Sequence, residues 1–258
     1  MVISNTKPLL SSVLNILKLM VESGAEIYRV EESAKLIFKS YGFKNIDVFA
    51  TTSNIIISLE REDGVINTHT KRIEKIGTDI EKIDRLNSLV RENTAKQPSV
   101  EYIENEIAQI EKTNRYPTFV NISFYGIIAG AFYFFFGGKS FLEFILSTSI
   151  GMCTGLLSVV FEKIDVNKIL SKFILSFCAA FIALVFNVKG LDFGTDYIII
   201  ANIMTLIPGI GLTNSLRDLF VGDNISGVLR LIESGLSALA IACVYVAAAT
   251  VILLGGAM

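Results

Sequence analysis

Five long, uncharged and mostly apolar runs lie from residue 116 onward in this 258-residue chain, and they restrict its fold more than any other feature. A helix needs about 17–25 predominantly apolar residues to cross the hydrocarbon of a bilayer. The runs therefore predict a transmembrane domain of about five helices over residues 116–258. Their bounds are 116–138, 144–161, 173–188, 197–216 and 234–258.

The charged residues lie mostly ahead of these runs. Residues 1–115 hold 33 of the 48 Asp, Glu, Lys and Arg residues, although 52% of the whole chain is hydrophobic and its mean hydropathy is +0.56. A polar domain over residues 1–115 is therefore expected to precede the membrane domain. The net charge of −2 does not indicate a nucleic-acid partner. The three cysteines all lie in apolar runs without a CxxC spacing, so neither a disulfide framework nor a metal site is indicated.

Loop charges predict that the amino terminus is cytoplasmic. We expect no signal peptide, because Lys7 and Pro8 are followed by an amphipathic stretch. With the amino terminus inside, the external loops carry only two basic residues, Lys139 and Lys189. This is the asymmetry of the positive-inside rule. This predicts a multi-pass protein of the plasma or inner membrane with Met258 outside. The cytoplasmic connections then carry Lys112, Arg115, Lys163, Lys168, Lys172, Arg217 and Arg230.

Apolar periodicity in residues 1–115 predicts an α+β domain. Two spacings typical of a capping box, Ser23 with Glu26 and Thr78 with Glu81, are expected to begin helices. The expected elements, in order, are a helix over 9–21, a helix from about Ala25 to Tyr41, a hairpin of Asp47–Glu60 and Val65–Ile73 around a turn at Arg61–Gly64, a helix after Thr78, and a helix that starts at Pro98 and Ser99.

The polar domain contains no recognisable catalytic motif. It lacks a Walker A loop, a nucleophile elbow, an HExxH motif and a dinucleotide-binding glycine pattern, and no cofactor is indicated. Its one histidine, His69, is expected to be a partly exposed strand residue. The run Thr51–Asn54 is a weak candidate for a recognition strand, while Glu26, Arg29, Glu31 and Glu32 are read as a solvated helix face. A membrane-anchored enzyme with its chemistry in residues 1–115 stays open as an alternative.

Small residues in the first two apolar runs predict close helix packing. Gly126 and Gly130 lie four residues apart in the first run, and Gly151 and Gly155 have the same spacing in the second. This small-xxx-small pattern lets two helix backbones approach each other in lipid.

The fourth apolar run is expected to be broken or kinked at Pro208. Proline has no amide hydrogen and disfavours helix at the residue before it, and Gly209 and Gly211 allow unusual backbone angles. A transporter can use the freed backbone groups of a discontinuous helix to bind substrate or water. A purely structural kink stays open as the other interpretation.

Charged residues follow this break. Asp218 is a candidate to pair with Arg230 or to accept a proton or cation during a transport cycle. Asp223 lies in a turn flanked by glycine, and Glu233 stands at the start of the last run. The alternative is a loop over 217–230 that lies in cytoplasmic water and merely connects two helices.

Several short motifs follow one another over nearly the whole chain. They are Gly24–Glu31, Val48–Thr52, Pro208–Gly209 with Thr213–Asn214, Arg217–Leu219, and Gly222–Asp223 with Ile225–Gly227. In type and order these motifs resemble the threonine/serine exporter family, specifically the larger subunit of its split, two-component form. One departure is Thr52, where the family usually has proline, and it weakens inferences about that loop.

The resemblance implies a cytoplasmic domain followed by about five spans, and a smaller hydrophobic partner of four or five spans. It also implies efflux of threonine and serine, or of dicarboxylates such as succinate. We therefore expect one subunit of a secondary exporter, an oligomer in contact with membrane lipid, driven by an ion gradient because no nucleotide-binding loop is present. An assembly or scaffold subunit is a further alternative. The expected substrate-binding residues are Asn202, Thr205, Pro208, Gly209, Asn214 and Arg217, and the expected coupling residues are Asp218, Asp223 and Glu233.

Overall fold

The computed structural model describes residues 6–60, 64–112, 116–188 and 194–256, which form two compact units. The first unit comprises Met1–Asn114 together with Ile210–Ile232, and the second comprises Arg115–Gly209 together with Glu233–Met258. Residues 61–63 of the expected hairpin turn, the loop residues Arg115 and Lys189, and Met258 lie outside the described ranges.

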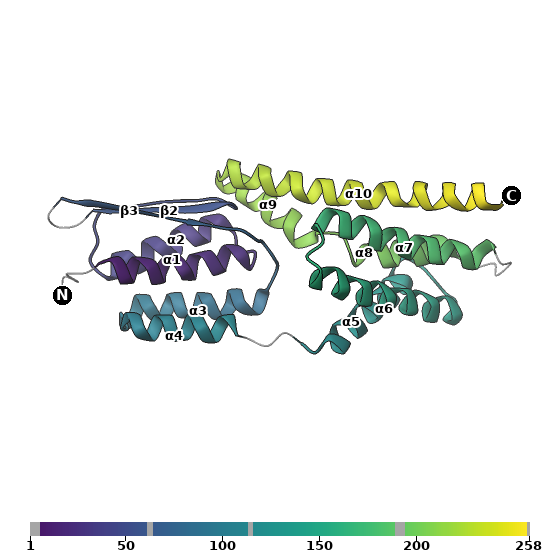
Figure 1. Ribbon diagram of the computed structural model, residues 1–258, viewed down its shortest axis with the longest axis horizontal. Coiled ribbons are helices and arrows are strands. Elements are labelled where there is room, and N and C mark those ends of the chain that lie inside the picture. Colours follow the sequence, from purple (N-terminus) through teal and green to yellow (C-terminus); the bar gives the residue numbers. More distant parts are fainter. Residues whose placement is uncertain (1–5, 61–63, 113–115, 189–193, 257–258) are drawn as a thin grey trace. The chain divides into compact units, whose positions relative to one another are not determined.

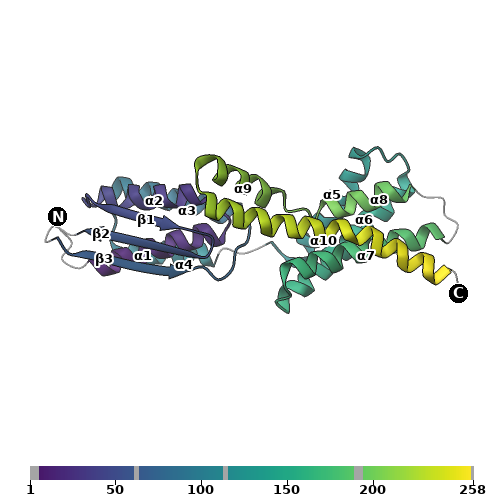
Figure 2. The ribbon, with the colours of Figure 1, turned by 90° about the horizontal axis from the view of Figure 1, so that it is seen from above.

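The first unit places a small antiparallel sheet on a set of helices (Figure 1). The central helix α1 contacts strands β2 and β3 as well as helices α2, α3 and α4, so it lies inside the unit. Figure 2 shows the three strands side by side. The elements are α1 (Thr6–Glu22), α2 (Ile27–Ser40), β1 (Ile46–Ala50), β2 (Asn54–Glu60), β3 (Ile66–Arg72), α3 (Ile80–Lys96), α4 (Val100–Glu111), α9 (Gly209–Val221) and the first turns of α10 (Asn224–Gly256).

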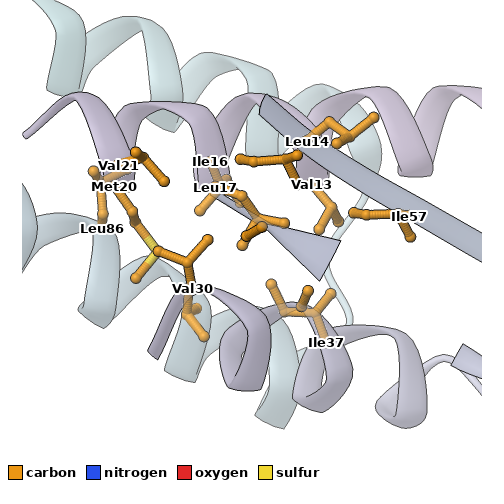
Figure 3. Close-up of a cluster of buried hydrophobic side chains, with 14 of the residues drawn as sticks. Val13, Leu14, Ile16, Leu17, Met20, Val21, Val30, Ile37, Ile57 and Leu86 are labelled. Carbon is orange, nitrogen blue, oxygen red and sulfur yellow. The ribbon is translucent and has the colours of Figure 1, made fainter. Parts of the chain in front are cut away.

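The core of this unit is built around α1. Figure 3 shows Val13, Leu17 and Met20 among side chains from α2, β2 and α3. The opposite side of α1 carries Ser11, Asn15 and Lys18, which are partly or fully exposed, as expected of an amphipathic helix. The expected apolar face of residues 9–21 is therefore confirmed, and further buried residues extend it around the helix: Leu9, Ile16 and Val21.

The sheet has three strands instead of the two expected. Ile55, Ile57 and Leu59 of β2 are buried, which is the alternation of a strand with one face on a core. The stretch predicted as one strand, Asp47–Glu60, is divided because the Thr51 hydroxyl accepts hydrogen bonds from the amides of Ser53 and Asn54, at 3.2 and 3.1 Å. Residues Thr51–Ser53 therefore form a turn that leads into β2, which begins at Asn54, so the expected strand is wrong for these three residues. A recognition role for the run stays a prediction.

The helix starts differ from the predicted capping boxes. Helix α3 is capped by Asp79, whose carboxylate accepts from the Lys82 amide at 3.0 Å, and not by Thr78. Ser99 caps α4 as expected, since its hydroxyl accepts from the Tyr102 amide. The capping box of Ser23 and Glu26 was wrong, because Glu26 is itself the N-cap of α2 and makes no side-chain cap bond.

The second unit consists of helices, four of which are long and apolar enough to cross a membrane when α10 is included. A fifth span results if α8 and α9 are counted together. The chain is thus a multi-pass membrane protein with a small three-stranded sheet near its amino terminus. The helices of this unit are α5 (Thr118–Phe135), α6 (Phe141–Lys163), α7 (Lys168–Val188), α8 (Thr195–Met204) and the remainder of α10.

Helices α5 and α6 pack through their small residues, as predicted. A Cβ atom added at Gly126 would lie 2.9 Å from the Thr148 carbonyl oxygen. One added at Gly151 would lie 2.7 Å from the Ala129 Cβ. The two helices approach so closely that these positions have no room for a side chain.

Candidate functional site

The predicted helix interruption is present. Helix α8 ends at Met204 and α9 begins at Gly209, with Pro208 directly before the new helix. The Thr205 hydroxyl donates to the Asn202 carbonyl at 2.7 Å and so satisfies one acceptor at the end of α8. Proline supplies no amide hydrogen to continue the ladder, which accounts for the position of the break.

Asn202, in the last turn of α8, is a buried polar side chain with an unused acceptor. Its side chain is 1% exposed, and its Nδ2 donates to the Ser147 hydroxyl at 3.1 Å and to the Ile198 carbonyl at 2.9 Å. Ser147 in turn donates to the Ala129 carbonyl of α5 at 3.2 Å. Among the described residues the Asn202 Oδ1 has no hydrogen-bond partner. An unpaired buried acceptor costs about 1–3 kcal/mol, so this atom is suited to a ligand that carries a donor.

Sequence reasoning missed Ser147. The signal was available, because Ser147 lies four residues before Gly151 and eight before Gly155 and continues the same stripe of small residues. Its hydroxyl orients the Asn202 amide, so it belongs to this site.

A second group of predicted residues binds the turn between α1 and α2. The Asp218 side chain is fully buried, and its Oδ1 accepts from the Ile27 amide at 3.2 Å. Arg230 donates from Nη2 to the Ala25 carbonyl at 2.7 Å, and its Nη1 lies 3.4 Å from the Asp218 Oδ2. The ion pair between Asp218 and Arg230, one of the two roles considered for Asp218, is therefore present.

Two residues of α9 extend this contact. Asn214 donates from Nδ2 to the Gly24 carbonyl at 3.0 Å, and Arg217 forms an ion pair with Glu26. Because of this ion pair, Glu26 belongs to a specific contact and not to a simple solvated face. The turn itself requires glycine at residue 24, because Gly24 has a φ of +92° and an added Cβ would lie 2.7 Å from the Gly77 carbonyl oxygen.

Asp218 acts as a long-range cap for α2. The first amides of a helix have no partner within the helix, and a carboxylate near them is also favoured by the helix dipole. Because Glu26 makes no local side-chain cap bond, the carboxylate of a residue 191 positions later supplies the acceptor.

Asp223 lies at a pocket of about 460 Å³ that is also lined by α2. On its α2 side, the Glu31 Oε1 accepts from the Ala50 amide at 2.8 Å. Burial raises the pKa of the Glu31 carboxyl, with a smaller contribution from the nearby Asp223 carboxylate, while the Ala50 hydrogen bond and Lys35 act in the opposite direction. The Asp223 Oδ2 is buried and has no hydrogen-bond partner in the described part of the chain. Glu31 was read as solvated from the sequence, and its partial burial corrects that interpretation.

The predicted site residues thus form separate groups. Asn202, Thr205, Pro208 and Gly209 belong to the second unit, as does Glu233, which is exposed. Those that contact or lie near α2 and the preceding turn belong to the first unit: Asn214, Arg217, Asp218 and Asp223. Sequence reasoning also missed the turn Gly24–Ile27 as their binding partner, although both sides of this contact lie in the motifs that carry the family resemblance.

The comparisons with known proteins agree with this resemblance. The chain matches the family model ThrE, "Putative threonine/serine exporter", over residues 11–252. No curated protein and no solved structure matches the chain. The matched range includes all the predicted site residues and parts of both compact units. The chain therefore belongs to the threonine/serine exporter family, a family of membrane transporters.

Proposed function

We propose that this chain is one subunit of a secondary exporter that moves small polar metabolites out of the cell across the plasma or inner membrane. The observation that carries the proposal is the interrupted helix, with the buried and unpaired Oδ1 of Asn202 in the turn before the break. Discontinuous helices are typical places for substrates to bind in secondary transporters. In this proposal the substrate contacts Asn202, Thr205 and the backbone at Pro208 and Gly209.

The unpaired atom favours one class of substrate. The Asn202 Nδ2 already donates to Ser147, so the amide offers an acceptor and not a donor. An amino acid such as threonine or serine brings ammonium and hydroxyl donors, whereas an ionised dicarboxylate such as succinate brings only acceptors. We therefore favour amino-acid export, with dicarboxylates as the second candidate.

The Asp218 contact supplies a route for coupling. Protonation of Asp218 would weaken both its ion pair with Arg230 and its hydrogen bond to the Ile27 amide. The α1–α2 turn would then be released from α9, the helix that follows the break. Asn214 and Arg217 would act through the same turn, and Asp223 and Glu233 are further candidates for the coupling ion.

The soluble part of the first unit is cytoplasmic in this proposal, and a smaller membrane subunit completes the pathway. An ion gradient supplies the energy, because the sequence contains no nucleotide-binding loop. Since the family is one of transporters, we do not propose the membrane-anchored enzyme further.

Efflux from proteoliposomes tests the proposal. Vesicles holding the chain and its partner would be loaded with labelled L-threonine or succinate. Asn202→Leu should lower threonine efflux about tenfold to a hundredfold, the effect of losing a hydrogen bond to a charged donor. Ser149→Ala is the matched control, because Ser149 is exposed and, among the described residues, its hydroxyl bonds only the Ile145 carbonyl of its own helix.

Three results would contradict the proposal. Unchanged threonine efflux by Asn202→Leu would remove the site. Efflux of succinate without threonine would reverse the preferred substrate class. Transport by the partner alone would leave this chain as an assembly subunit.

A further inference from the structure

Helix α9 has its polar side buried and its apolar side exposed, which is the reverse of a helix on the surface of a water-soluble protein. Ser215 and Asp218 are buried, while Phe220 is 88% exposed. The exposed side also includes Ile210, Leu216 and Val221. Polar atoms of α9 bind the α1–α2 turn, whereas its apolar side is exposed in the part of the chain that the structure describes.

The start of α10 repeats this pattern. Ser226 and Arg230 are buried, whereas apolar side chains on the other side are exposed. Gly227 allows α9 and α10 to lie close together, because a Cβ added there would be 2.9 Å from the Leu219 amide nitrogen. Figure 2 shows α9 and the first turns of α10 as a hairpin. The exposed apolar residues of its α10 side are Ile225, Val228, Leu229 and Ile232.

An apolar surface of this kind is unusual on a water-soluble unit and marks an interaction site. Both ends of the hairpin continue without a linker into the second unit, at Gly209 and at Glu233. Helix α10 runs on directly into an apolar membrane segment, and its exposed apolar side continues beyond the hairpin with Leu236 and Leu239. Where α10 crosses a bilayer, lipid would cover this same side of the helix a few residues further on.

We propose that the hairpin of residues 210–232 lies in the interfacial region of the bilayer, with its apolar side in lipid and its polar side on the soluble part of the first unit. Amphipathic helices bind at this depth, with their apolar side about 5–10 Å into the boundary between headgroups and acyl chains. Helix α9 is then not the second half of a transmembrane span. The hairpin holds the turn Gly24–Ile27 at the membrane surface, and the hydrocarbon-spanning part of α10 begins near Glu233.

The polar network explains why α9 does not cross the hydrocarbon. Asp218 and Arg230 are buried by the α1–α2 turn, whose amide and carbonyl groups they bind. A charged pair of this kind would lose those partners within hydrocarbon, where unsatisfied polar groups are strongly unfavourable. At the interface the polar side of the hairpin binds the α1–α2 turn while its apolar side contacts lipid.

Spin-label depth measurements on the full chain in phosphatidylcholine and phosphatidylglycerol vesicles test this proposal. The native cysteines are first removed as Cys153→Ala, Cys178→Ala and Cys243→Ala. Labels at Phe220→Cys and Ile225→Cys report on the two helices of the hairpin. Labels at Leu239→Cys, on α10 in the membrane segment, and Ile66→Cys, on β3, are the controls, because these side chains are 60% and 64% exposed. Collision with oxygen and with a water-soluble nickel chelate gives the depth of each label.

The hairpin labels should both lie at the interface, between the depths of the two controls. Labels as deep as that at residue 239 would overturn the proposal and make α9 part of a span. Labels as accessible to the chelate as that at residue 66 would place the hairpin in water and also overturn it. Protection from both reagents would mean that protein and not lipid covers the surface, and it would overturn the proposal as well. Repeating the measurement with and without the smaller subunit would then separate that partner from a second copy of this chain. None of these outcomes depends on transport, so the proposal fails or holds separately from the proposed function.

Discussion

Replacing Asp218 should release the turn between α1 and α2. Asp218→Ala removes the acceptor for the Ile27 amide, worth about 1 kcal/mol for a helix cap, and leaves the buried Arg230 without its carboxylate. Breaking a buried ion pair from one side costs about 3–5 kcal/mol. Asp218→Asn keeps an acceptor for Ile27 and should be milder. Arg230→Met combined with Asp218→Ala should cost less than the sum of the single changes, because no unpaired charge remains.

Hydrogen exchange of the backbone amides in residues 25–32 is the measurement. Each 1.4 kcal/mol of lost protection is a factor of ten, so a loss of about 3 kcal/mol makes Asp218→Ala exchange about a hundredfold faster there. Asp47→Ala, at an exposed position of β1, is the control and should leave these amides unchanged. Wild-type protection of residues 25–32 in Asp218→Ala would refute the view that this carboxylate caps α2.

Three further predictions concern single contacts. Arg217→Ala should change the stability of the first unit by at most about 1 kcal/mol in chemical unfolding, because the guanidinium paired with Glu26 is half exposed, and a larger loss would contradict this view of the ion pair. Gly151→Ala should destabilise the α5–α6 pair by about 1–3 kcal/mol, measured as a lower melting temperature, whereas Gly235→Ala, with open space at its Cβ position, should not lower it. The Glu31 carboxyl has a pKa raised in the folded state, so its ionisation disfavours folding: stability should fall as pH rises from about 4.5 through the raised value, and Glu31→Gln should flatten that slope in pH-dependent melting curves.

Much of the fold was predictable because it depends on local patterns. The apolar period of residues 9–21 gave α1, the cap at Ser99 gave α4, and the paired glycines of α5 and α6 gave their close packing. The predictions of local structure were wrong where a side chain has several possible hydrogen-bond partners nearby. The Thr51 hydroxyl binds the amides of its own turn and divides a predicted strand, and Asp79 instead of Thr78 caps α3. The alternative hydrogen bonds differ by about 1 kcal/mol in the stability they provide, and the composition of the segment does not indicate which one forms.

The candidate site was predictable in its residues and not in its partners. The sequence drew attention to Asn202, Pro208 and Asp218 because polar or helix-breaking residues are costly near apolar runs. It gave no sign that Asp218 binds the Ile27 amide or that Asn202 is oriented by Ser147. These contacts join residues 191 and 55 positions apart, and periodicity within a short window carries no information about them.

The sequence by itself determined that the chain has a charged first part and a membrane part whose fourth apolar run is interrupted at Pro208, because charge, hydropathy and the missing proline amide act locally. Only the tertiary structure decided that residues 210–232 pack with the first unit. The physical reason is that an apolar run of the same length can form a helix that crosses lipid or a helix whose polar face is buried against protein. Which of the two forms depends on hydrogen-bond partners far away in the chain, here the backbone of Gly24, Ala25 and Ile27.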